Sequence, residues 1–211
     1  MPAMEILSPA GSPQALRAAV ASGADAVYFG GGGFNARHFA QNFEGEDMAR
    51  AIAFCRQNGV RSYVTVNTLV NDLELPAVTA YLKELCELGV DAVIVQDTGL
   101  MRMLQSLAPE LPVIASTQAA ANSLPAMECM RRLGCTRAVA GRELSGKELR
   151  ALCKDAPLEV EAFCHGALCY SVSGQCYLSA VVGRRSANRG KCAGPCRLPY
   201  SMGGGQPRHM L

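Results

Sequence analysis

Seven short apolar runs alternate with helical patterns along the first 163 residues, and this alternation constrains the fold more than any other sequence feature. Runs such as 26–29, 63–66 and 92–95 lack alternating polar positions, which is typical of strands buried on both faces. Amphipathic helices between such strands predict a parallel sheet covered by helices. With 49% hydrophobic residues, the chain can bury the core that this arrangement needs. The expected strands are 5–7, 26–29, 63–66, 92–95, 112–115, 137–140 and 158–163.

Local signals mark where several helices begin. Ser12 with Pro13 reads as an N-cap followed by a first-turn proline, and Ser145 with Glu148 has the spacing of a capping box. Seven strand–helix units without a dinucleotide-binding fingerprint favour a TIM-type barrel over a doubly wound sheet. The glycines at 30–33 lack the spacing of a phosphate-binding loop. We therefore predict an α/β fold, an incomplete (β/α)₈ barrel over residues 1–165.

The C-terminal end departs from this pattern. A closed barrel of this type has eight strands, and seven are visible in the sequence. Residues 201–211 are rich in glycine and contain no apolar run of strand length, so we expect a disordered tail there. We also expect the sequence to be a truncated piece of a longer protein.

A cysteine-rich segment, residues 166–200, follows the predicted barrel. Glycine-containing turns separate its thiols, so the backbone can fold back and bring them together. Because the sequence has no secretory features, four thiols close together are better explained by a metal or cluster site than by two disulfides. Only Cys192 and Cys196 form a tight pair, whereas zinc ribbons favour two such pairs, and iron–sulfur clusters accept irregular spacing. We predict a [4Fe–4S] cluster on Cys169, Cys176, Cys192 and Cys196, with zinc or unligated thiols as alternatives; Cys164 is expected to pack inside the last strand.

Polar residues gather at the ends of the predicted strands, where barrel enzymes place their chemistry. The candidate catalytic residues are His165, Arg142, Glu143 and Asp97, and the candidate substrate-binding residues are Asn35, Arg37, Asn67, Gln96, Ser116 and Gln118. Arg37 and Arg142 are the candidates for binding a small anion. His165 suits general acid–base catalysis or a structural hydrogen bond equally well. Asp97 and Glu143 are as consistent with helix caps or solvated loops as with a site.

A basic cluster lies beside the cysteines, although the net charge of the chain is only +2. It comprises Arg184, Arg185, Arg189, Lys191 and Arg197. Such a cluster is either a solvated surface or a contact for RNA phosphates. We add Arg184, Arg185 and Arg189 to the candidate substrate-binding residues on the second interpretation.

The ordered runs 165–169, 173–176, 186–190 and 192–200 resemble the signature of the collagenase-like peptidases, peptidase family U-32. Residues 6–12 and 23–28 are similar to the N-terminal part of the same family. That family also includes bacterial proteins that hydroxylate ribosomal RNA, transfer RNA or ubiquinone precursors without molecular oxygen. The resemblance implies a hydroxyl donor of the prephenate type, a small anion.

The residues favour the hydroxylating branch over proteolysis. The sequence has no H-E-x-x-H pair, no G-x-S-x-G elbow and no recognisable Cys–His nucleophile. We therefore predict RNA-base hydroxylation, with proteolysis of a collagen-like peptide second and a non-catalytic RNA-binding or assembly role third. The expected partners are ribosomal or transfer RNA and the anionic donor. No apolar run approaches membrane-spanning length, so we expect no membrane partner and a cytoplasmic location.

Overall fold

The computed structural model describes residues 4–36, 41–201 and 206–209. Its main feature is one sheet of seven parallel strands in the order β1 to β7, so each strand pairs with its neighbour in sequence. This sequential order is that of a β/α barrel and confirms the predicted fold class. The strands are β1 (Leu7–Pro9), β2 (Ala26–Gly30), β3 (Arg61–Val66), β4 (Ala92–Val95), β5 (Val113–Ala115), β6 (Cys135–Val139) and β7 (Glu159–Glu161).

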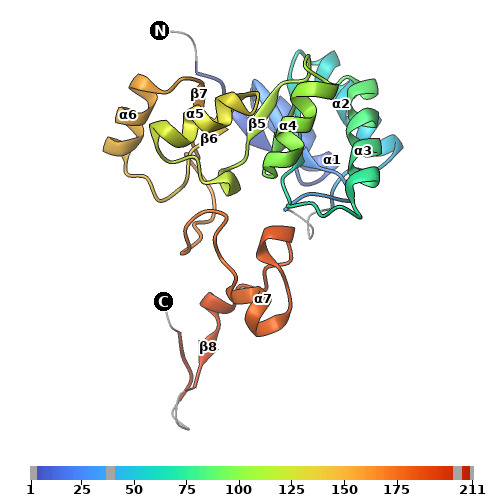
Figure 1. The fold of residues 1–211 in the computed structure, drawn as a ribbon. Helices are drawn as coiled ribbons and strands as arrows, with labels where there is room; N and C mark the ends of the chain where they lie inside the picture. Colours follow the sequence, from blue (N-terminus) through green and yellow to red (C-terminus); the bar gives the residue numbers. More distant parts are fainter. Residues whose placement is uncertain (1–3, 37–40, 202–205, 210–211) are drawn as a thin grey trace.

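Six helices connect the strands and lie on the outer face of the curled sheet (Figure 1). Ser12 caps the first helix by accepting a hydrogen bond from Ala15 N–H, and both bonds of the Ser145–Glu148 capping box are formed. These predicted helix starts are therefore confirmed. The helices are α1 (Pro13–Ala21), α2 (Glu46–Gln57), α3 (Leu75–Leu88), α4 (Thr98–Leu107), α5 (Leu124–Arg132) and α6 (Gly146–Asp155).

The side chains of the strands divide into two buried layers. Alternate residues such as Val64 and Val93 join the large core between sheet and helices. The residues between them, including Tyr63, Ala92 and Ile94, form a smaller core on the concave inner face. Since successive residues of a strand point to opposite faces, every second residue of β3, β4 and β5 points into the barrel. This parity positions the side chains that follow the strands.

The sheet curls far enough for its two edges to share contacts. Glu5, just before β1, accepts a 2.6 Å hydrogen bond from Arg137 of β6 and lies 3.1 Å from the hydroxyl group of Tyr63 in β3. Within the described residues, β1 and β7 do not pair, so the barrel is open between them. The chain is thus an incomplete TIM-type barrel, as predicted.

The cysteine-rich segment leaves the sheet after β7 and forms a lobe below the carboxyl ends of the strands (Figure 1). The lobe contains α7 (Leu178–Gly183) and the short 3₁₀ turns η2 (Ala187–Arg189) and η3 (Pro195–Arg197). Its last strand, β8 (Pro199–Tyr200), pairs antiparallel with β9 (Arg208–His209). The sequence did not predict β9, which lies in the tail expected to be disordered.

One local expectation is wrong. Cys164 was expected to pack inside the last strand, but β7 ends at Glu161 and Cys164 is exposed. The reason is that β7 pairs over only three residues with β6 before the chain turns away from the sheet. Among the described residues, no helix is both long and apolar enough to span a membrane.

Candidate functional site at the barrel mouth

Three predicted residues form one layer at the mouth of the barrel. Asn67, Gln96 and Ser116 directly follow β3, β4 and β5, whose last residues are paired in register. They continue the inward parity of Tyr63 and Ile94. The Asn67 side-chain amide donates to Ser116 Oγ at 3.4 Å, passing across β4. The structure therefore brings together residues that are 49 positions apart in the sequence.

A hydrogen-bonded clasp attaches the lobe to the mouth. Arg142 donates to Ser173 Oγ at 3.1 Å, and Ser173 Oγ donates to Glu143 Oε2 at 3.0 Å. Asn122 also donates to Glu143, at 2.7 Å. Ser173 is fully buried by these contacts. We call Arg142, Glu143 and Ser173 the clasp.

The clasp changes how two predicted catalytic residues are interpreted. Burial alone raises the pKa of Glu143, but hydrogen bonds from its own backbone, Ser173 and Asn122 outweigh it and lower that pKa. Glu143 is therefore ionised at neutral pH and acts as an acceptor rather than as a general acid. Arg142 and Glu143 each form a hydrogen bond with Ser173 and so hold it in place. Their geometry is that of positioning residues for the lobe.

A cavity of about 290 Å³ opens where the lobe meets the loops after β2 and β3. Arg189 of the lobe makes a bidentate pair with Glu74, both contacts being 2.7 Å. Arg189 also donates to the carbonyl oxygen of Leu69 at 3.0 Å. Asn35, predicted from the sequence, and Arg189 both line this cavity. Its complete lining is Gly32, Gly33, Phe34, Asn35, Thr68, Glu74, Arg189 and Lys191.

Replacing Glu74 by Gln is expected to loosen the lobe around Arg189. Hydrogen bonds from Arg189 and from the Asn71 backbone lower the pKa of Glu74 to about 2. Because this pKa lies below the ordinary 4.5, the pair stabilises docking above about pH 4.5, and its contribution is lost as pH falls through 2. We expect faster amide hydrogen exchange at residues 186–191 in the Glu74→Gln protein at neutral pH.

Glu128→Gln is the matched control for this measurement. The pKa of Glu128 is also about 2, because Arg131 and Arg132 donate hydrogen bonds to it. All three residues belong to α5, so this pair does not involve the lobe. Exchange in the lobe should therefore not change in this variant. Equal exchange rates in the Glu74→Gln and wild-type proteins would contradict a docking role for the pair.

The remaining predicted residues are dispersed. Asp97 caps α4 by accepting from Leu100 N–H at 3.0 Å and also accepts from Val70 N–H at 3.2 Å. His165 is exposed beyond the end of β7. Arg184 and Arg185 are exposed next to α7, and Arg37 lies outside the described residues. Gln118 is part of η1 (Thr117–Ala119) at the mouth, and its backbone carbonyl group lies against Gly174 of the lobe.

Sequence reasoning missed the three other polar residues of the cavity, Thr68, Glu74 and Lys191, as site residues. Thr68 and Glu74 follow β3, but neither belongs to a polar run that marks a site. Lys191 was visible only as a member of the basic cluster. Only the packing of the lobe against the barrel shows that these residues share a cavity with Arg189.

The four predicted ligand cysteines have suitable chemistry but are not assembled. Burial raises the pKa of Cys169, but hydrogen bonds from Ser171 N–H and Arg142, with the charges of Arg142 and Arg197, outweigh it and lower that pKa. Cys192 Sγ accepts from Gly194 N–H at 3.3 Å. However, no three His, Cys, Asp or Glu side chains in the described part of the chain are placed to hold a metal ion. The donor set fits a cluster, whereas its arrangement does not.

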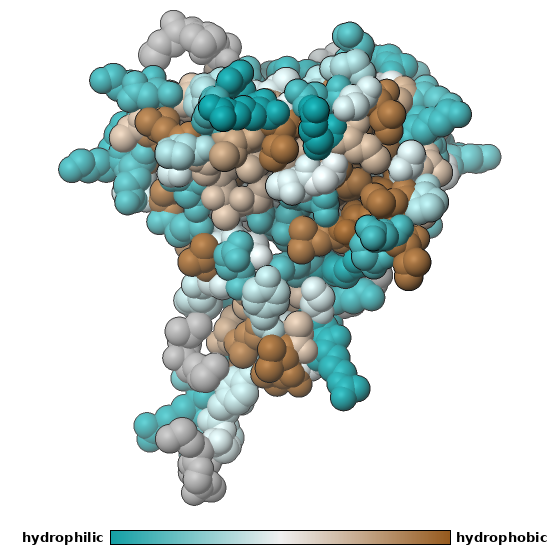
Figure 2. Space-filling model, viewed as in Figure 1, coloured by the Kyte–Doolittle hydropathy of each residue, from teal (hydrophilic) through white to brown (hydrophobic). Residues whose placement is uncertain are grey.

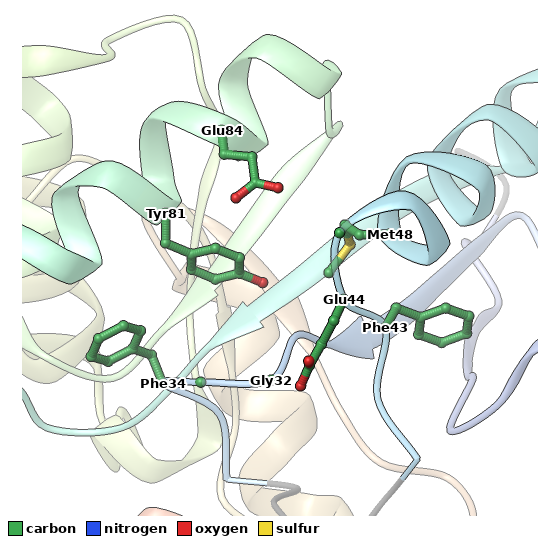
Figure 3. Close-up of a pocket in the computed structure, with 9 residues that line it drawn as sticks. Gly32, Phe34, Phe43, Glu44, Met48, Tyr81 and Glu84 are labelled. Atoms are coloured by element: carbon green, nitrogen blue, oxygen red, sulfur yellow. The ribbon is translucent and has the colours of Figure 1, made fainter.

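A second cavity, of about 240 Å³, lies between the loop after β2 and helix α3 (Figure 3). Phe34, Tyr81 and Met48 form its apolar wall, and Glu44 and Glu84 add two carboxylates. Burial, followed by these two charges, raises the pKa of Tyr81. Carboxylates repel RNA phosphates and an anionic donor. The cavity at the lobe is therefore the better candidate site.

The chain resembles known proteins along nearly its whole length. The sequence profile described as Peptidase family U32 matches residues 11–209. The chain belongs to peptidase family U32. The solved structure of the U32 peptidase Mk0906 superposes with a TM-score of 0.65 at 18% identity, covering 76% of this chain and 68% of that one. At this identity the similarity establishes the fold alone.

Curated relatives of this U32 chain include RNA-modifying proteins and a protease. A 23S rRNA 5-hydroxycytidine C2501 synthase of Escherichia coli is 40% identical over 97% of this chain and 31% of the relative. A tRNA hydroxylation protein P1 of Bacillus subtilis is 35% identical over 94% of the chain and 47% of the relative. A collagenase of Porphyromonas gingivalis is 36% identical over 94% and 50%. The chain thus spans about a third to a half of the length of these relatives.

Proposed function

We propose that the full-length protein hydroxylates a pyrimidine base of ribosomal or transfer RNA without molecular oxygen. The observation that carries this proposal is the 40% identity, over 97% of the chain, to an enzyme named for 5-hydroxycytidine in rRNA. In the proposed reaction, a ring carbon exchanges C–H for C–OH and is oxidised by two electrons. A prephenate-type donor exchanges its hydroxyl group for hydrogen and is reduced by two electrons, so the transfer balances.

The charge distribution supports RNA as the partner. From Ala162 to Leu211 there are six Lys and Arg residues and no Asp or Glu, which leaves fourteen basic and eighteen acidic residues in the preceding 161. The two parts therefore have formal charges of +6 and −4. Figure 2 shows a hydrophobic patch on the same lobe. Tyr170 is exposed there, and the Arg197 guanidinium lies 5.1 Å from the centre of its ring. Cations with exposed aromatic rings suit unpaired RNA.

The cavity between lobe and barrel supports a small anionic donor. Lys191 lines it beside Arg189, whose charge is largely balanced by Glu74 of the same lining. Guanidinium and ammonium groups bind carboxylates through charge-assisted hydrogen bonds. At about 290 Å³, the cavity is near the lower limit of ligand pockets, roughly 300–1,000 Å³, and suits a single ring with short substituents.

The proposed cofactor is a [4Fe–4S] cluster on Cys169, Cys176, Cys192 and Cys196, with zinc as the second choice. These four thiols lie in one loop-rich lobe, and the lowered pKa of Cys169 favours the thiolate that binds metals. When bound, such a cluster supplies electron transfer. Ligation requires the four thiols to move closer together than they lie among the described residues.

Replacing Cys169 by Ser is expected to abolish cluster binding. The wild-type protein, purified without oxygen, should be brown and contain iron and sulfide, and the variant should be colourless with the iron lost. Cys164→Ser is the matched control, because Cys164 is exposed and outside the proposed ligand set. Stoichiometric zinc without iron in the wild-type protein would contradict the cluster.

Proteolysis is the second candidate, and the 36% identity to a collagenase favours it. The two activities separate in one experiment. Anaerobic, purified full-length protein would be incubated with a prephenate-type donor and RNA from a strain lacking the gene, and in parallel with gelatin. We expect a nucleoside heavier by one oxygen atom and intact gelatin. Cleaved gelatin with unmodified RNA would reverse the ranking.

A further inference from the structure

Gln96 is a buried amide whose oxygen has no partner. The residue is only 7% exposed, and its Oε1 makes no hydrogen bond to any described residue. Leaving a buried acceptor unpaired costs roughly 1–3 kcal/mol. A leucine at this position would avoid that cost, so the glutamine is explained by a group that binds to it.

The neighbours of Gln96 fix its position. Asn67 follows β3 and Ser116 follows β5, the strands on either side of β4. The hydrogen bond between these two side chains passes across β4, which Gln96 follows. Ser116 also accepts a hydrogen bond from Gln118 N–H at 3.3 Å. These bonds hold the side chains on both sides of Gln96 in place.

Two further side-chain oxygens near this layer are, like Gln96 Oε1, buried and without a hydrogen-bond partner among the described residues. These oxygens are Thr68 Oγ1 and Gln118 Oε1. Thr68 follows Asn67 directly, is 3% exposed and lines the cavity of about 290 Å³. Gln118 follows Ser116 by two residues. Unpartnered polar groups thus follow three successive strands at one mouth.

The chemistry of this layer selects a neutral ligand. Asn67, Gln96, Ser116 and their unpartnered neighbours carry amide and hydroxyl groups and no charge, whereas the cations Arg189 and Lys191 lie in the lobe. A carboxylate would be drawn to the lobe residues rather than to the layer. A flat heterocycle with both donors and acceptors satisfies amide groups, which present both.

We infer that the Asn67–Gln96–Ser116 layer receives a single pyrimidine base turned out of the RNA, with Gln96 reading its Watson–Crick edge; this rests on the proposed function. A glutamine amide donates and accepts at once. In one orientation it pairs with N3 and the N4 amine of cytosine, and in the flipped orientation with N3–H and O4 of uracil, so the orientation in which the site holds the amide sets the preferred base. Enzymes that modify a base read such an extruded base by hydrogen bonds to this edge.

The Gln96→Leu variant of the full-length protein tests the inference through base preference. Two RNAs that differ only in the target pyrimidine, cytidine or uridine, would be compared. The kcat/KM for the preferred base should fall about tenfold to a hundredfold, because a site built to hydrogen-bond a substrate discriminates strongly. The cytidine-to-uridine ratio should move toward one, while RNA affinity is unchanged and the melting temperature is the same or higher.

Gln105→Leu is the matched control, because Gln105 is exposed on α4 and should leave all these quantities unchanged. A Gln96→Leu protein with wild-type kcat/KM, or with equal losses on both RNAs and an unchanged ratio, would overturn the inference.

A second readout does not depend on turnover. Free cytidine and uridine would be added to the wild-type protein and observed by saturation-transfer NMR. We expect binding of the preferred nucleoside that disappears in Gln96→Leu and persists in Gln105→Leu. Absence of binding to the wild-type protein would overturn the inference. Gln96-dependent binding without RNA hydroxylation would instead refute the proposed function and leave the base site standing.

Discussion

Replacing Arg137 by Met is expected to lower the free energy of unfolding by about 3–5 kcal/mol, because it leaves the largely buried carboxylate of Glu161 without its cation and removes one of two cations from Glu5. The Arg137 side chain is 13% exposed and contacts Glu5 at 2.6 Å, Glu159 at 2.8 Å and Glu161 at 3.6 Å. Its guanidinium also lies 5.6 Å from the ring centre of Tyr63. These contacts join residues beside β1 to β3, β6 and β7 at the end of the barrel opposite the lobe.

The titration of these groups agrees with this role. Burial alone lowers the pKa of Arg137, but hydrogen bonds to Glu5 and Glu159 raise it well above its usual value. Burial also raises the pKa of Glu161, only partly offset by Arg137. Without Arg137, the charged form of Glu161 would lose this compensation.

Arg61→Met provides the control, because Arg61 also pairs with Glu5 but is 52% exposed. An exposed pair of this kind contributes about 0–1 kcal/mol. Urea unfolding of the three proteins measures both changes. Equal, small losses for Arg137→Met and Arg61→Met would show that the buried cluster does not stabilise the barrel.

Replacing Gly174 by Ala is expected to release the lobe from the barrel mouth. A Cβ atom at Gly174 would lie 2.1 Å from the backbone oxygen of Gln118, which no side-chain rotation can relieve. Gly174 also has φ +74°, a conformation that costs a non-glycine residue roughly 1–2 kcal/mol. Since Gly174 follows Ser173 of the clasp, the clash should break the hydrogen bonds to Arg142 and Glu143.

Limited proteolysis of residues 166–200 detects this release. We expect cleavage at least about tenfold faster than in the wild type, because a loss above about 1.4 kcal/mol raises the open population tenfold. Gly23→Ala is the control, since Gly23 has φ +85° but no atom within 4 Å of an added Cβ. It tests backbone strain without the clash. Identical cleavage in Gly174→Ala and Gly23→Ala would show that the contact with Gln118 does not hold the lobe.

The sequence predicted the features that depend on short-range patterns. The capping box of Ser145 and Glu148 and the buried strand at 92–95 are local, and both form as expected. Strand ends also predicted Asn67, Gln96 and Ser116 at one mouth, because parallel strands deliver their carboxyl ends to the same side.

Features that depend on docking of the lobe were not predictable in this way. Arg142 and Glu143 follow β6 like catalytic residues, but they bind Ser173, which is about 30 residues away. Thr68 and Glu74 face a cavity whose other wall comes from residues near 190. The exposure of Cys164 depends on where β7 stops pairing with β6. The apolar residues just before Cys164 do not indicate where that pairing ends.

Mass spectrometry of RNA nucleosides from cells with and without the gene tests the central claim most directly. Both strains would be grown without oxygen, and the deletion strain would be complemented by the full-length gene. We expect one hydroxylated pyrimidine nucleoside of ribosomal or transfer RNA to disappear on deletion and to return on complementation. Identical nucleoside profiles in all three strains would contradict it.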